Sequence, residues 1–83
     1  MKALTDLKPG ERAEVRSVRA RGAMRQRLLE LGFVPGTVVE LDLTAPFGTL
    51  RAYRLRSSVF ALRETESSRV EIRLVQTDEE RTE

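Results

Sequence analysis

Alternating apolar and polar residues mark most of this chain as β-structure. In the segment TVVELDLT, residues 37–44, every second residue from Val39 onward is apolar and the residues between are polar. A period of two places the apolar side chains on one face of a strand. The same pattern predicts further strands at residues 50–56 and 69–75, and a weaker alternation predicts one at residues 13–18. We also expect a strand at residues 58–63.

A different period appears between the strands predicted at residues 13–18 and 37–44. Met24, Leu28 and Leu31 are spaced i, i+4, i+7, which places them on one stripe of a helix that starts near Gly22. This stripe predicts a short helix packed on the sheet. The polar segment ETESS, residues 64–68, predicts only a turn or one turn of 3₁₀ helix.

The segment RLLELGFVPGT predicts how that helix ends. Gly32 stands where a left-handed residue follows a helix, because glycine has no Cβ to clash there. Counting back from Gly32, Leu28 and Phe33 occupy the two positions that make the hydrophobic contact of a Schellman cap. Pro35 and Gly36 then favour a type II turn. We therefore expect a capped helix and a tight turn that leads directly into the next strand.

Five short strands and one helix predict a mainly β fold, namely a small five-stranded SH3-like barrel with one short helix between strands 1 and 2. A chain of 83 residues has room for one domain, and closure of the sheet would remove its exposed edges. An OB-type barrel also has five strands, but its helix lies between the third and the fourth. We assign residues 1–75 to the barrel domain and expect the acidic segment 76–83 to be a disordered tail.

The composition narrows the possible chemistry. Cysteine and histidine are both absent, which removes the usual ligands of zinc and copper and the common nucleophile–base pairs. Glu40 and Asp42 share one strand face, where we expect them to pair with Arg51 or Arg54 rather than to hold a metal ion. We therefore expect no catalytic residue, no cofactor and no metal site, and hence no enzyme. The lack of cysteine and of a signal-peptide pattern favours a cytoplasmic location.

Positive charge is concentrated in one part of the sequence. The net charge is +2, but residues 76–83 carry four acids and one base, so residues 1–75 carry 14 bases and 9 acids, a net of +5. No acid interrupts the stretch that holds Arg16, Arg19, Arg21, Arg25 and Arg27. Such a run is either a solvated face or a docking surface for an acidic protein or an anionic membrane. Nucleic acid is disfavoured, because stacking on bases needs more exposed aromatic side chains than the chain has.

A second candidate contact is the segment APFG, residues 45–48. Pro46 and Gly48 are explained by a hairpin loop. Phe47 is not required by that loop, so it either folds back onto the barrel or anchors a partner. We therefore add Pro46, Phe47 and Gly48 to the candidate partner-binding residues.

The segments LKPGERAEV, RQRLLELGFVPGTVVEL, APFG and ALRETESSRVEI occur in this order, and together they resemble the ferrous-iron transport protein A (FeoA) family. The chain is nearly as similar to the SH3-like domain at the C-terminus of iron-dependent repressors. The resemblance covers about residues 4–74. The chain departs from the family pattern after the second strand, where Thr49 and Leu50 stand in place of an Asp-Pro pair.

The resemblance implies a cytoplasmic accessory or regulatory module of bacterial ferrous-iron uptake, with a family link to transition-metal-ion binding. The implied partner is the membrane ferrous-iron permease with a GTP-binding domain, and the inner membrane surface is a further candidate contact. Family members are taken to act by protein contact and not by catalysis. Two alternatives stay open, a sensor or dimerisation module and a small basic RNA-binding barrel, and a homo-oligomer is compatible with all three.

Overall fold

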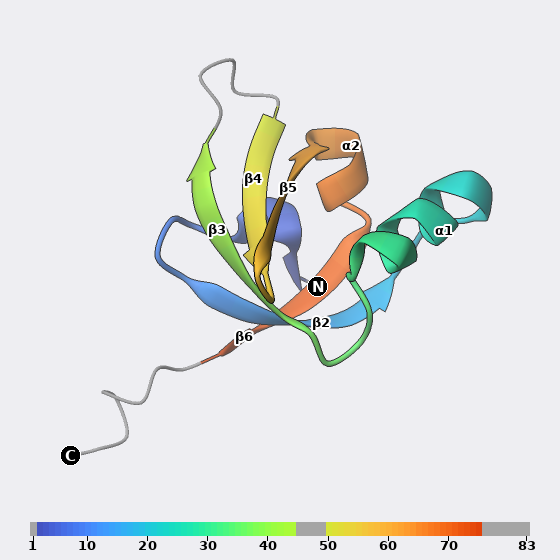
Figure 1. Ribbon diagram of the computed structural model, residues 1–83. Coiled ribbons are helices and arrows are strands. Elements are labelled where there is room, and N and C mark those ends of the chain that lie inside the picture. Colours follow the sequence, from blue (N-terminus) through green and yellow to red (C-terminus); the bar gives the residue numbers. More distant parts are fainter. Residues whose placement is uncertain (1, 45–49, 76–83) are drawn as a thin grey trace.

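The computed structural model describes residues 2–44 and 50–75. It contains a six-stranded antiparallel sheet with the strand order β1-β6-β2-β3-β4-β5 and three short helical elements (Figure 1). The elements in chain order are β1 (Lys2–Ala3), the 3₁₀ helix η1 (Leu4–Asp6), β2 (Arg12–Val18), α1 (Gly22–Leu31), β3 (Val38–Thr44), β4 (Leu50–Leu55), β5 (Ser58–Arg63), α2 (Glu64–Ser67) and β6 (Val70–Val75).

The mainly β class is confirmed, but the element count differs from the expectation of five strands and one helix. The extra strand is β1, in which Lys2 pairs with Ile72 of β6. Two residues are too few to show a period of two, so the sequence pattern gave no sign of this strand. Because β1 comes first, α1 lies between the second and third strands of the fold. Residues 64–67 form a further helix, α2.

The expected closed barrel is wrong, because within the described residues the sheet is unclosed and no ladder joins β1 to β5. Helical elements fill the gap instead. The helix α2 contacts both the edge strand β5 and the helix η1, and Figure 1 shows α2 beside the end of β5. Ser67 of α2 is fully buried there, and its hydroxyl donates to the carbonyl oxygen of Arg63 at 3.2 Å. The chain therefore covers this gap with α2 and η1 rather than with paired strands.

The core lies inside the curved sheet and receives one fully buried side chain from α1. Tyr53 occupies it and donates a hydrogen bond from its hydroxyl to the carbonyl oxygen of Leu4 at 3.2 Å. Leu28 is the fully buried residue of α1, while Met24 and Leu31 are partly buried against the same cluster. The other fully buried apolar residues come from the strands and from the segments that precede them: Leu4, Leu7, Ala13, Val15, Phe33, Val39, Leu55, Leu62 and Val70.

The end of α1 has the geometry of a Schellman cap. Gly32 has a φ of 114°, a value that glycine adopts without the Cβ clash of other residues. The amide of Phe33 donates to the carbonyl of Leu28 at 3.1 Å, and the amide of Gly32 donates to the carbonyl of Leu29 at 3.0 Å. A Cβ added at Gly32 would lie 3.1 Å from Cδ1 of Leu55. The helix therefore ends against the sheet at a position suited to glycine.

The turn after α1 is fixed to β2 as well as closed on itself. The amide of Thr37 donates to the carbonyl of Val34 at 3.0 Å, and Gly36 has a φ of 97°. The amide of Gly36 donates to the carbonyl of Val15 at 2.9 Å, and the amide of Val15 donates to the carbonyl of Thr37 at 2.8 Å. These bonds set the start of β3 against β2, so the position of α1 is determined at its C-terminal end.

Candidate functional site

The five arginines of the sequence cluster lie on β2, on the connection that follows it and on α1, and the structure divides them by partner. Arg27 forms an ion pair with Glu66 of α2. The Nε atom of Arg19 lies 3.5 Å from Oε1 of Glu71 on β6. Arg16 is exposed on β2, at the point where the register between β2 and β6 shifts. The cluster is therefore not one continuous cationic surface.

Three other guanidinium groups near the start of α1 have no ion pair with any residue that the structure describes. Two of them, Arg21 and Arg25, belong to the sequence cluster, and Arg69 does not. Arg69 is brought there by the pairing of β2 with β6, because the amide of Arg19 donates to the carbonyl of Arg69 at 2.6 Å. The long separation in sequence hid this residue, and only knowledge of the β2–β6 pairing would have revealed it.

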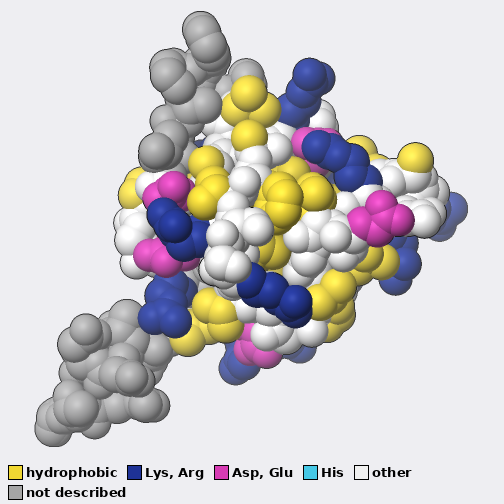
Figure 2. Space-filling view, viewed as in Figure 1, with side chains coloured by type: hydrophobic (Ala, Val, Ile, Leu, Met, Phe, Trp, Pro, Cys, Tyr) yellow, Lys and Arg dark blue, Asp and Glu magenta, His cyan; other side chains and the backbone are white. Residues whose placement is uncertain are grey.

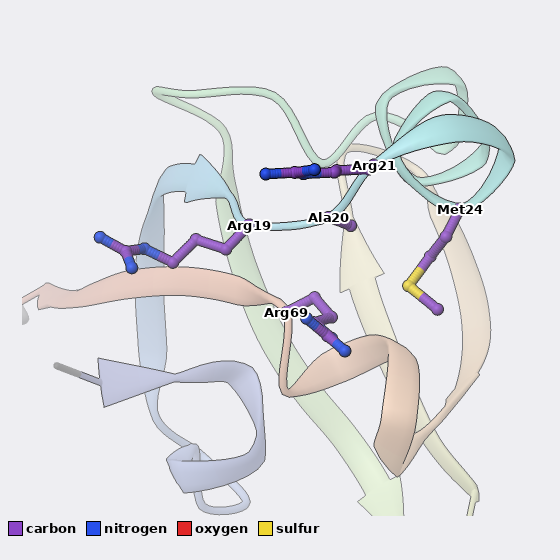
Figure 3. Close-up of a pocket in the computed structure, with 5 residues that line it drawn as sticks. All are labelled: Arg19, Ala20, Arg21, Met24 and Arg69. Carbon is purple, nitrogen blue, oxygen red and sulfur yellow. The ribbon is translucent and has the colours of Figure 1, made fainter.

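A hollow of about 550 Å³ opens between the end of β2, the start of α1 and the start of β6. Its lining consists of Arg19, Ala20, Arg21, Met24 and Arg69. Figure 3 shows Arg21 and Arg69 on opposite sides of the segment that carries Ala20. Met24 reaches in from α1, and the side chain of Arg19 points away from these residues. We call this the arginine hollow. Its rim is cationic, and Met24 and Ala20 give it an apolar part.

A second hollow of about 490 Å³ lies on the solvent side of α1. Its lining consists of Gly22, Arg25, Gln26, Leu29 and Glu30, which we call the outer face of α1. Helical geometry places this face opposite the stripe that packs on the core. Leu29 is half-buried on this face, and the side-chain amide of Gln26 donates to the carboxylate of Glu30 at 3.1 Å. The outer face therefore combines an apolar centre with charged and polar groups around it.

Glu71 of β6 lies next to Arg19 and Arg16 of the arginine cluster. The hydroxyl of Ser17 donates a hydrogen bond of 2.8 Å to its Oε1 atom, and Arg19 and Arg16 add positive potential. The hydrogen bond from Ser17, with the two arginines, holds the pKa of Glu71 below its ordinary value, although partial desolvation opposes them. Since Glu71 is committed to Ser17 and Arg19, it does not neutralise Arg21 or Arg69.

The other candidate residues either lie outside the described residues or pair across strands. Pro46, Phe47 and Gly48 lie outside the described residues, as does the segment 76–83. Asp42 pairs with Arg54 across β3 and β4, at 2.9 Å between Oδ1 and Nη2. No group of three or more acidic residues that could hold a metal ion occurs in residues 2–44 and 50–75. In those same ranges no helix is long and apolar enough to cross a membrane.

The model of the FeoA domain matches residues 2–74. The chain belongs to the FeoA family. A curated FeoA-containing relative is the Fe(2+) transport protein A/Fe(2+) transporter FeoB fusion protein of Porphyromonas gingivalis (strain ATCC BAA-308 / W83), with 31% identity over 75 residues. That match covers 90% of this chain but only 9% of the fusion protein.

Solved FeoA structures share the fold. The FeoA protein of Chlorobium tepidum has 32% identity and a TM-score of 0.83, over 93% of this chain and 73% of its own. Iron(II) transport protein A of Clostridium thermocellum has 28% identity and a TM-score of 0.84, over 89% of this chain and 46% of its own. The FeoA of Stenotrophomonas maltophilia, solved with zinc and described as a prokaryotic SH3 domain protein, has 34% identity and a TM-score of 0.79, over 88% and 91%. The FeoA resemblance of the sequence is thereby confirmed, together with its SH3-like fold.

Proposed function

We propose that this FeoA-family chain is a cytoplasmic accessory of bacterial ferrous-iron uptake, which acts by contact with the membrane iron permease and not by catalysis. The observation that supports this best is the relative in which an Fe(2+) transport protein A and the transporter FeoB form one polypeptide. Fusion keeps two domains at a high effective concentration. That arrangement is useful when the two domains work in contact, so we expect the same partner for this FeoA-family chain.

The outer face of α1 is the proposed contact. Leu29 offers apolar area at its centre, and Arg25 offers a cation with no ion pair among the described residues. Apolar anchors supply most of the affinity of an interface, while charges at the rim steer the encounter. The remaining arginines of the cluster add to that steering, and anionic lipid beside a membrane permease would attract them as well. Pro46, Phe47 and Gly48, which lie outside the described residues, are a second proposed contact.

The test is binding of the purified chain to the detergent-solubilised permease of the same organism, measured by biolayer interferometry. We expect the variant Arg25→Glu to weaken binding about tenfold, a cost of about 1.4 kcal/mol, because it reverses a charge at the rim of the contact. Lys8→Glu is the matched control, since Lys8 is exposed and belongs to the segment between η1 and β2, which Figure 1 shows on the side of the molecule away from α1. We expect its affinity to stay within about twofold of the wild type.

Three further results would decide whether the outer face of α1 is the permease contact. Leu29→Ser should lower affinity without unfolding the chain, because Leu29 lies on the solvent side of α1 and is only half-buried. Equal loss of affinity in Arg25→Glu and Lys8→Glu would show that overall charge, and not the outer face of α1, controls binding. Absence of any binding by the wild type would refute the proposed function.

A further inference from the structure

The arginine hollow is a different surface from the proposed permease contact, and it has an excess of positive charge. Arg19, Arg21 and Arg69 line it. Arg19 and Arg21 belong to the connection between β2 and α1, and Arg69 directly precedes β6. The acid beside it, Glu71, already accepts from Ser17 and pairs with Arg19. Within the described chain, Arg21 and Arg69 have no acid to pair with. The fold itself therefore leaves at least two guanidinium groups available for an external anion.

The backbone beside Arg21 adds to this preference. Arg21 is the N-cap residue of α1, its backbone is extended, and its side chain makes no capping hydrogen bond. The first turn of α1 contains no acidic residue. The first amide groups of a helix and its dipole favour negative charge. Since Arg21 and Met24 both line the hollow, this weak positive potential acts in the same direction as the arginines.

The size and lining of the hollow define the class of anion. An arginine recognises phosphate through two parallel N–H groups, so one or two arginines suffice for a single phosphate group. Arg21 and Arg69 lie on opposite sides of the segment that carries Ala20, and two guanidinium groups placed apart around about 550 Å³ fit a longer anion. Met24 and Ala20 provide apolar contact for a part of the ligand that carries no charge. We propose that the arginine hollow binds a small ligand that carries two or more linked phosphate groups.

Two sources share this chemistry, namely inorganic pyrophosphate or triphosphate and the phosphate chain of a nucleotide. Isothermal titration calorimetry on the full chain distinguishes them, with pyrophosphate, triphosphate, ATP, GTP and orthophosphate as the probes. Binding of the linked phosphates more tightly than orthophosphate supports the proposal. A nucleotide that binds more tightly than triphosphate identifies the nucleotide as the source, with its base on Met24, whereas equal affinities identify the inorganic anion.

Variants connect the binding to the hollow. The double variant Arg21→Gln, Arg69→Gln should bind triphosphate at least about tenfold more weakly, because it removes two charge-assisted contacts. Both residues are exposed, so we expect the circular dichroism spectrum and the melting temperature to be retained. The matched control is the double variant Arg54→Gln, Arg73→Gln, which removes the same charge from strands on which each arginine is paired with an acid. Its affinity should stay within about twofold of the wild type.

Several outcomes would overturn the proposal. They are equal loss of affinity in the two double variants, affinity for orthophosphate equal to that for triphosphate, and binding to anionic vesicles without binding to any soluble phosphate. The last result would assign the arginines to a membrane surface instead. The permease assay above is independent of this one, because it probes Arg25 and Leu29, which do not line the arginine hollow. Failure of one proposal therefore leaves the other standing.

Discussion

The strand ladders and the α1 end of the molecule differ in how some of their arginines are paired, although Arg19 and Arg27 near α1 also meet acids. On the sheet, Arg73 of β6 faces Glu14 of β2 as its direct cross-strand neighbour, and their side chains form an ion pair. Arg54 of β4 forms an ion pair with Asp42 of β3, although its direct cross-strand neighbour is Glu40. At the α1 end, Arg21 and Arg69 have no such partner in the described chain. Figure 2 shows basic and acidic side chains side by side over the β3 side, and several basic groups together with acidic ones around the α1 end.

The difference follows from the backbone. An antiparallel ladder fixes which residues lie opposite one another, so an acid and a base placed at partner positions meet. The start of a helix and the connections around it have no ladder, and no register brings an acid to each arginine there. Exposed ion pairs contribute at most about 1 kcal/mol each, so neither arrangement determines the fold. The charge left unmatched at the α1 end is therefore available for binding.

The two regions also differ in how they are held, and Leu28→Ala tests this difference most strongly. Leu28 is the fully buried residue of α1, and removal of a buried leucine side chain costs about 2–5 kcal/mol through lost burial and the cavity left behind. We expect a loss of this size in urea unfolding followed by circular dichroism. Leu29→Ala on the outer face is the control and should cost clearly less. Similar losses in both variants would mean that α1 is not held to the sheet through Leu28.

Gly32→Ala is expected to have the next largest effect. A non-glycine residue in the left-handed region costs about 1–2 kcal/mol, and at Gly32 the new Cβ would also press on Leu55 at 3.1 Å. Gly36→Ala is the matched control, because Gly36 has a similar φ of 97° with open space around it. Thermal unfolding should therefore place Gly32→Ala below Gly36→Ala in melting temperature. The reverse order would contradict the close approach of α1 and β4.

The smallest effect concerns Glu71, where the two regions meet. Its pKa is held down in the folded state by the Ser17 hydrogen bond and then by Arg19 and Arg16. A lowered pKa contributes stability above the unfolded value, and this contribution is lost as the pH falls through the folded pKa. Ser17→Ala should raise the pKa of Glu71 toward its ordinary value, as measured by NMR titration. Glu71→Gln should make acid unfolding less steep, and an unchanged titration in Ser17→Ala would exclude the hydroxyl as the main cause.

Local patterns predicted the elements because local physics determines them. The alternation from Val39 onward predicts a strand with one buried face, and Val39 and Leu41 are buried as that pattern requires. Gly32 reports the end of α1, since glycine tolerates the left-handed backbone that the cap needs. Closure of the sheet was predicted wrongly, because a rule about edges does not reveal that α2 and η1 cover the gap.

The candidate site could be predicted only in part. The run of arginines from Arg16 to Arg27 is visible in the sequence, but its division between paired and available groups is not. Arg27 is paired with Glu66, which is distant in sequence, whereas Arg69 joins the hollow through the β2–β6 ladder. Both facts depend on which segments meet in space. The sequence therefore located the cationic region without identifying the residues that remain able to bind.

Glu66 connects α1 and α2 through its two carboxylate oxygens. Oε1 accepts from the amide of Arg63, at the start of α2, and Oε2 pairs with Arg27 of α1. Its side chain is only 14% exposed, so little water is present to replace either contact. Mechanical force applied to α1 at Arg27 would therefore reach the junction of β5 and α2 through the Arg27–Glu66 ion pair. Any event that pulls α1 outward would load the place where α2 and η1 cover the gap in the sheet.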